Sequence, residues 1–235
     1  MDNLPPWTVR ESPRAKRVIL RMTPHTGLEV VIPRGFPRSR LPQILQEKKP
    51  WIVKTWRRLQ EQGQVQEWAR ELPRAISCPA IGQEFTVEYV PGVGPNVCLI
   101  SLHPTHLKII GDMQQQEDCC TLLQRWLAQQ GRLHLVPWLA QLSAETGLNY
   151  QKVEIRGQKT LWGSCSGRGA ISLNFRMLFL QPGAVRYLLL HELCHTRHLD
   201  HSKKFYSLLE HFEPDWRAWR QELRLAWSQV PWWAK

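Results

Sequence analysis

One segment constrains the fold of this chain more than any other, because an apolar helical run leads directly into a cluster of histidines. The run VRYLLL (185–190) is apolar almost all round, which is typical of a helix buried within a protein. The sequence HELCHTRHLDH (191–201) follows at once and holds four of the nine histidines of the chain. We therefore expect a buried helix that holds its polar side chains rigidly at one end.

The first two histidines of this cluster are spaced to bind one metal ion. His191 and His195 are four residues apart, so both imidazoles project from the same face of a helix. Glu192 lies next to the first of them, where a carboxylate can reach metal-bound water without itself binding the metal. This is the HExxH pattern, in which two histidines hold zinc and the glutamate acts as the general base.

The third ligand is less directly specified. His198 lies on the same face but ~10 Å along the helix axis from His191, which is too far for both to reach one tetrahedral ion. We expect the chain to leave the helix near residues 198–200, so that His201 approaches from another direction and Ser202 caps the next helix. The spacing 191/195/201 also matches HExxHxxGxxH, although the glycine and the following methionine turn of that motif are absent.

Other residues near this motif remain as alternatives. Glu210 or Glu213 could supply a downstream carboxylate ligand instead of His201. His198 and His211 are expected to be solvated or to lie at the edge of the core. Tyr206 could stabilise a developing oxyanion, but packing of its aromatic ring is the favoured interpretation.

The predicted centre supports hydrolysis. Three protein ligands leave one zinc position for water, whose pKa falls from ~15.7 toward 7. Glu192 would take a proton from this water, the hydroxide would attack a carbonyl, and Glu192 would return the proton to the leaving nitrogen.

The rest of the sequence predicts an α+β fold, with a β-rich N-terminal half followed by a mostly helical C-terminal half. Expected strands lie at 17–22, 28–33, 84–90, 96–101, 106–110, 152–156 and 170–174. Expected helices lie at 39–72, 117–147, 182–198, 202–212 and 214–228. Pro50 is expected to divide the first helix, and Pro137 to kink or break the second. The domain boundary is placed between residues 1–113 and residues 114–235.

Basic residues are concentrated at the N-terminus. The net charge is +11, and residues 1–60 alone hold 13 basic and 4 acidic side chains. Such an excess could attract DNA or another polyanion, although it is also typical of a merely solvated surface. The sequence has no membrane-spanning run and no secretory signal, and its six cysteines form no CxxC pair. We therefore expect a cytoplasmic protein without a membrane partner.

Several motifs together resemble the YgjP-like metallopeptidase domain family, relatives of the SprT-like zinc proteases. In this chain the motifs are Trp162-Gly163-Ser164-Cys165-Ser166, Ile171-Ser172-Leu173-Asn174, Pro182, His191 to His195, His201-Ser202, Phe205-Tyr206 and Pro214-Asp215. Leu161 and Tyr206 depart from the arginine and tryptophan usual in the family.

The resemblance implies a zincin-like C-terminal half and a zinc metallopeptidase that acts on peptides or proteins. It implies that His191, His195 and His201 are the zinc ligands and that Glu192 is catalytic. The SprT-like relatives also suggest an alternative, a DNA-associated protease that uses its basic N-terminal region. The segment Trp162–Ser166 could offer a strand edge to a peptide, or could simply cover the helix. The sequence assigns no substrate-binding residue.

Overall fold

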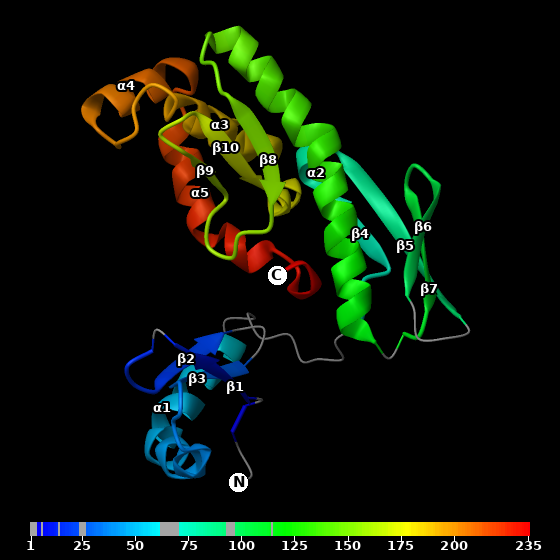
Figure 1. Ribbon diagram of the computed structural model, residues 1–235, viewed down its shortest axis with the longest axis vertical. Helices are drawn as coiled ribbons and strands as arrows, with labels where there is room; N and C mark the ends of the chain where they lie inside the picture. Colours follow the sequence, from blue (N-terminus) through cyan, green and yellow to red (C-terminus); the bar gives the residue numbers. More distant parts are fainter. Residues whose placement is uncertain are drawn as a thin grey trace. The chain divides into compact units, whose positions relative to one another are not determined.

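The structure is a computed structural model that describes residues 4–5, 7–13, 15–23, 27–61, 71–92, 97–113 and 115–235. It is mixed α and β, with 48% helix and 26% strand, in agreement with the expected α+β class. The chain divides into two compact units, Met1–Glu71 and Leu72–Lys235 (Figure 1). No helix in the described part of the chain is long and apolar enough to cross a membrane.

The first unit is a three-stranded sheet packed with one helix. Its elements are β1 (Trp7–Ser12), β2 (Ile19–Thr23), β3 (Gly27–Pro33) and α1 (Leu41–Glu61). The central strand β3 runs parallel to β1 and antiparallel to β2. The strands expected at 17–22 and 28–33 correspond to β2 and β3, while residues 24–26 between them lie outside the described residues. Apolar side chains of β3 and α1 form the core of this unit: Leu28, Val30, Ile32, Leu41, Leu45 and Ile52.

The expected division of the first long helix at Pro50 is wrong, because α1 continues through this proline. Pro50 is exposed, whereas Leu45 and Ile52 on either side of it are buried. Burial of the apolar face holds the helix together although the proline removes one backbone donor. The C-terminal end of the prediction, residues 62–70, lies outside the described residues.

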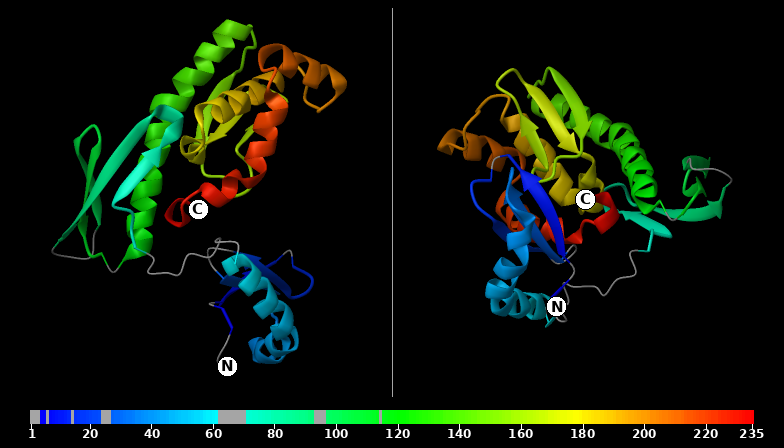
Figure 2. Two further views of the ribbon diagram at one scale, coloured as in Figure 1. Left: turned by 180° about the vertical axis from the view of Figure 1, so that it is seen from behind. Right: turned by 60° about the horizontal axis from the view of Figure 1, so that its bottom comes forward.

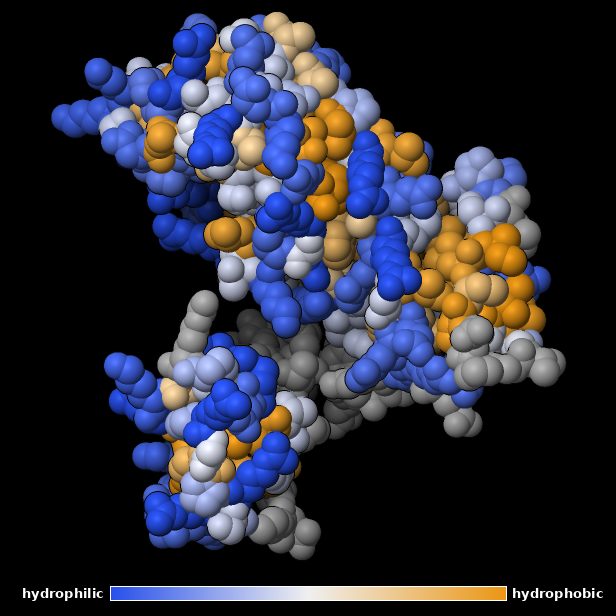
Figure 3. Space-filling view, in the orientation of Figure 1, coloured by the Kyte–Doolittle hydropathy of each residue, from blue (hydrophilic) through white to orange (hydrophobic). Residues whose placement is uncertain are grey.

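The second unit begins with a four-stranded sheet in the order β4-β5-β7-β6. Its strands are β4 (Ala75–Cys78), β5 (Gln83–Pro91), β6 (Cys98–His103) and β7 (His106–Gly111), and the long helix α2 (Gln116–Thr146) follows. Alternate residues of β5 and β7, such as Phe85 and Leu107, are fully buried. The other face is partly apolar and includes the exposed Ile100; Figure 3 shows hydrophobic residues gathered over β6 and β7.

This sheet belongs to the same compact unit as the histidine motif, so the predicted boundary near residue 113 is not where the two units separate. Phe85 of β5 makes an edge-to-face contact with Trp126 of α2, with ring centroids 4.7 Å apart. One continuous buried cluster includes both of these residues and Leu189. The pattern of local elements indicated a change from strand to helix at residue 113, but packing across that point joins the two sides.

A second sheet and three helices complete this unit. The strands are β8 (Lys152–Arg156), β9 (Gly163–Cys165) and β10 (Ala170–Asn174), in the order β8-β10-β9. The helices are α3 (Pro182–Cys194), α4 (Lys203–Phe212) and α5 (Trp216–Gln229). Figure 2 shows α2 along one side of this sheet and α5 close to α3. The helix α2 continues through Pro137, so the break that the sequence offered as one alternative to a kink does not occur.

Packing between α3 and α5 depends on a glycine. A Cβ atom built at Gly183 would lie 2.3 Å from Cζ2 of Trp219, so only glycine fits at this position without displacement of the indole. Most of the other residues of α3 are buried, and the helix ends at Cys194 rather than at the predicted residue 198. Ser202 occupies the N-cap position of α4 as expected, but its side chain makes no capping hydrogen bond.

Candidate metal centre

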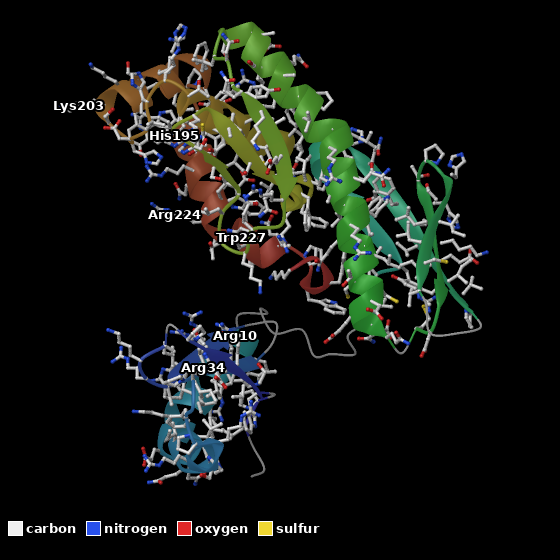
Figure 4. All side chains as sticks on the ribbon, in the orientation of Figure 1. Arg10, Arg34, His195, Lys203, Arg224 and Trp227 are labelled. Carbon is white, nitrogen blue, oxygen red and sulfur yellow. The ribbon has the colours of Figure 1, made fainter. Side chains whose placement is uncertain are left out.

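Three imidazole rings converge at the C-terminal end of α3. His191 lies in the last turn of α3, His195 is the C-cap residue of this helix (Figure 4), and His201 lies in the segment between α3 and α4. The Nε2 atom of His191 lies 3.2 Å from that of His195 and 3.1 Å from that of His201. In the described part of the chain, these three residues form a group whose ligand atoms lie within 4.8 Å of one another.

These separations fit a tetrahedral metal ion. Zinc binds imidazole nitrogen at 2.0–2.1 Å, and two such ligands at a tetrahedral angle are about 3.3 Å apart. The Nε2 separations of 3.1 and 3.2 Å are close to this value. The donor set therefore fits a metal such as zinc.

The backbone and a phenylalanine orient the three rings. The Nδ1 atom of His195 lies 2.9 Å from the carbonyl oxygen of His198, so Nδ1 carries the proton and Nε2 keeps its lone pair. Phe205 of α4 packs against all three rings, with centroids 4.5 to 4.9 Å away. Burial, with smaller contributions from neighbouring cationic groups, lowers the pKa of His191 to about 3, which keeps its ring neutral. His201 is exposed, so the centre is open to solvent on that side.

Glu192 is buried, unlike the exposed His201, and is only 4% accessible to solvent. Its Oε2 atom is buried and has no hydrogen-bond partner among the described residues. Burial raises the pKa of this carboxyl to about 8. A positive charge bound nearby would favour the carboxylate and lower this pKa. A buried, unpartnered carboxyl beside three nitrogen donors again fits a site that receives a cation and a polar ligand.

Strand β9 lies directly against Glu192, a contact that the sequence did not predict. A Cβ atom built at Gly163 would lie 2.7 Å from Oε1 of Glu192, so the absence of a side chain leaves room for the carboxylate. The preceding residue, Trp162, stacks on Trp227 of α5 with ring centroids 4.2 Å apart (Figure 4). The stack fixes the position of the glycine. The only sequence signal for this role was a glycine within the WGSCS motif.

The alternative ligands lie outside the histidine cluster. Glu210 forms an ion pair with Arg217, and Glu213 forms one with Arg186. The side chain of His198 lies instead with His211 along α4. These two histidines help to line an open depression of about 620 Å³, whose other lining residues are Lys203, Lys204, Ser207 and Leu208.

The favoured packing role of Tyr206 agrees with its surroundings. Its ring stacks on Trp216 with centroids 4.8 Å apart and an interplanar angle of 21°. Its hydroxyl oxygen accepts a hydrogen bond from Nη1 of Arg220 at 3.3 Å.

Taken with the HExxH spacing, this geometry is that of a metal-dependent hydrolase. The chain belongs to the YgjP-like metallopeptidase domain family, whose model matches residues 16–226. The match includes most of the first compact unit as well as the histidine cluster. Membership of this family indicates a metallopeptidase, with a metal cofactor and peptide or protein substrates. Searches of curated proteins and of solved structures find no match to the chain.

Proposed function

We propose that this chain is a zinc-dependent metallopeptidase of the HExxH type, with a zincin-like arrangement of its catalytic helix. His191, His195 and His201 would hold the zinc ion, and Glu192 would be the general base. Two observations carry this proposal: three Nε2 atoms converge, and the carboxyl of Glu192, the residue that follows His191, is buried with no hydrogen-bond partner for Oε2 among the described residues. Three imidazole donors suit zinc, and three protein ligands rather than four are typical of its catalytic sites.

When bound, the metal would supply Lewis-acid chemistry, which polarises the scissile carbonyl and makes water more acidic. The protein's own groups do the rest. Oε2 of Glu192 would accept a proton from the attacking water and then donate it to the leaving nitrogen. Because Gly163 has no side chain, the carboxylate of Glu192 fits against β9. The buried residues around α3 restrict the movement of this carboxylate. The hydrogen bond between His195 and the carbonyl of His198 keeps the ligand nitrogen available.

Metal content and hydrolysis, measured on four proteins, test the proposal. Wild type and His198→Ala should each bind about one zinc ion, because the backbone carbonyl of residue 198 is retained. His201→Ala should lose most of the metal. Glu192→Gln should keep the metal and lose casein or peptide hydrolysis by ~10²–10⁴-fold. Hydrolysis by Glu192→Gln at the wild-type rate, or equal zinc loss from the two histidine variants, would contradict the proposal.

A second candidate function, contact with DNA, is supported by the first compact unit. Exposed arginines and lysines are numerous there, and Arg10 and Arg34 are labelled in Figure 4. In the described part of this unit, Glu29 is the acid that pairs with them, through Arg10 and Arg21. Non-specific binding to duplex DNA should fall with salt at a slope near −0.9 per neutralised phosphate. No binding at ~50 mM salt would contradict this candidate.

A cytoplasmic location is also proposed. Cys78, Cys98, Cys119, Cys165 and Cys194 are free thiols, as expected in a reducing compartment.

A further inference from the structure

Arg220 is a cation next to the candidate metal centre, and no described acidic side chain neutralises it. It lies on α5 and is exposed. Its guanidinium carbon lies 5.9 Å from the ring centroid of Tyr206 and 6.0 Å from that of Trp216. Its Nη1 atom donates to the hydroxyl of Tyr206 at 3.3 Å. The side chain is therefore held over two aromatic rings rather than by a carboxylate.

The neighbouring arginines differ in this respect. Arg186 pairs with Glu213, and Arg217, on the same helix as Arg220, pairs with Glu210. Within the part of the chain that the structure describes, no carboxylate oxygen lies within 4.0 Å of Arg220. Glu210 and Glu213 are thus already engaged, and the charge of Arg220 remains available for an external anion.

The geometry places this charge near the metal centre. The hydroxyl of Tyr206 accepts the hydrogen bond of Arg220, and the ring of the same tyrosine has its centroid 6.1 Å from that of His201. A bound metal would add more positive charge here. An anionic ligand at this position would be attracted by both the metal and the guanidinium.

The two aromatic rings under Arg220, those of Tyr206 and Trp216, are held rigidly. Trp216 is only 6% exposed, and its stacking on Tyr206 fixes the tyrosine ring. The hydroxyl oxygen of Tyr206 accepts a hydrogen bond from Arg220, so the hydroxyl hydrogen can be donated to another group. Two donors, a guanidinium and a phenol, are therefore preorganised on the side of the centre formed by α4 and α5. Glu192 lies on the side formed by β9.

We propose that Arg220, together with the hydroxyl of Tyr206, binds an anionic oxygen of the peptide substrate. This inference rests on the proposed peptidase function and assigns two substrate-binding residues to it. A peptide substrate offers two oxygens that can carry this negative charge. One is the scissile carbonyl oxygen, which becomes negative in the transition state, and the other is the carboxylate at the C-terminus of a short substrate.

The test uses the full-length, metal-loaded chain and one peptide taken from its casein digest. The peptide is made in two forms, with a free C-terminal carboxylate and with a C-terminal amide. The variants are Arg220→Gln and Tyr206→Phe, which keeps the aromatic stack. Arg224→Gln is the matched control, because Arg224 is an exposed arginine one turn further along α5 (Figure 4). Zinc content and circular dichroism are measured for every variant.

If the anion is the carbonyl oxygen, Arg220→Gln should lower kcat by about 10²-fold on both peptides, with little change in KM. A phosphinic peptide that mimics the charged transition state should bind more weakly by a similar factor. If the anion is the terminal carboxylate, KM should rise by about 10-fold or more for the free acid and stay constant for the amide. The metal-free protein should then also bind the free acid more weakly after the substitution, which calorimetry would detect.

The inference is overturned if Arg220→Gln and Tyr206→Phe both behave like Arg224→Gln on the two peptides. It is also overturned if either variant loses zinc or helical content in proportion to its loss of activity, because the role would then be structural. Failure of the proposed function has a different signature. In that case Glu192→Gln, with Arg220 intact, would hydrolyse the peptides at the wild-type rate.

Discussion

Substitution of Gly163 by alanine should move the carboxylate of Glu192 without loss of the metal. The added Cβ would lie 2.7 Å from Oε1, 2.9 Å from Cγ and 3.0 Å from Cδ of Glu192. Ordinary contacts begin near 3.4 Å, so the carboxylate has to retreat by roughly 0.7 Å. The end of a side chain gives way more easily than backbone, so we expect a loss of stability at the low end of the ~1–3 kcal/mol typical of overpacking. Misplacement of a reacting group by about 1 Å can cost 10²-fold in rate.

The assay is therefore kcat on a casein peptide, together with zinc content and urea denaturation. Gly163→Ala should lose roughly 10- to 100-fold in kcat and keep its zinc. Gly167→Ala is the matched control, because a Cβ there would meet only Leu199, at an ordinary 3.6 Å. Neither glycine has a positive φ that would itself strain alanine. If the two variants have the same kcat, the contact between β9 and Glu192 does not position the base.

Two further predictions concern stability. Burial raises the pKa of Glu192 from 4.5 to about 8, so the folded metal-free protein binds this proton more tightly than the unfolded chain does. Its free energy of unfolding should then fall as the pH rises from about 4.5 to 8, by up to roughly 5 kcal/mol, and Glu192→Gln should lack this decrease. Urea denaturation with a chelator present checks this, and equal pH slopes for the two proteins would contradict it. Gly183→Ala should destabilise the chain by ~1–3 kcal/mol, because its Cβ would clash with Trp219; a rise in Tm, as helix propensity alone favours, would refute the packing argument.

Features set by local patterns could be predicted from the sequence. The alternation in β5 and β7 located both strands, and the spacing of His191 and His195 placed them on one helical face. The argument from helix rise, which excluded His198 and favoured a turn before His201, agrees with the end of α3 at Cys194. In each case the deciding information lies within about ten residues of sequence.

Features set by packing between distant segments could not be predicted in this way. Pro50 reads locally as a helix break, and only the burial of residues on both sides of it explains why α1 continues. The contact between Phe85 and Trp126 joins segments that sequence patterns assign to different domains. Gly163 has no local signature of its role, because the atoms that it accommodates belong to a helix almost thirty residues further along the chain.

The buried state of Glu192 is the strongest reason to propose a reaction rather than a purely structural metal. A structural zinc site needs four closed ligands, and this centre offers three nitrogens, one of them on an exposed histidine. Burying an ionisable carboxyl without a partner costs free energy, and a structural site would gain nothing from it. The chain nevertheless keeps a glycine beside this carboxyl and anchors that glycine through the stack of Trp162 on Trp227. Such a cost has a physical explanation if the carboxylate accepts and returns a proton during turnover.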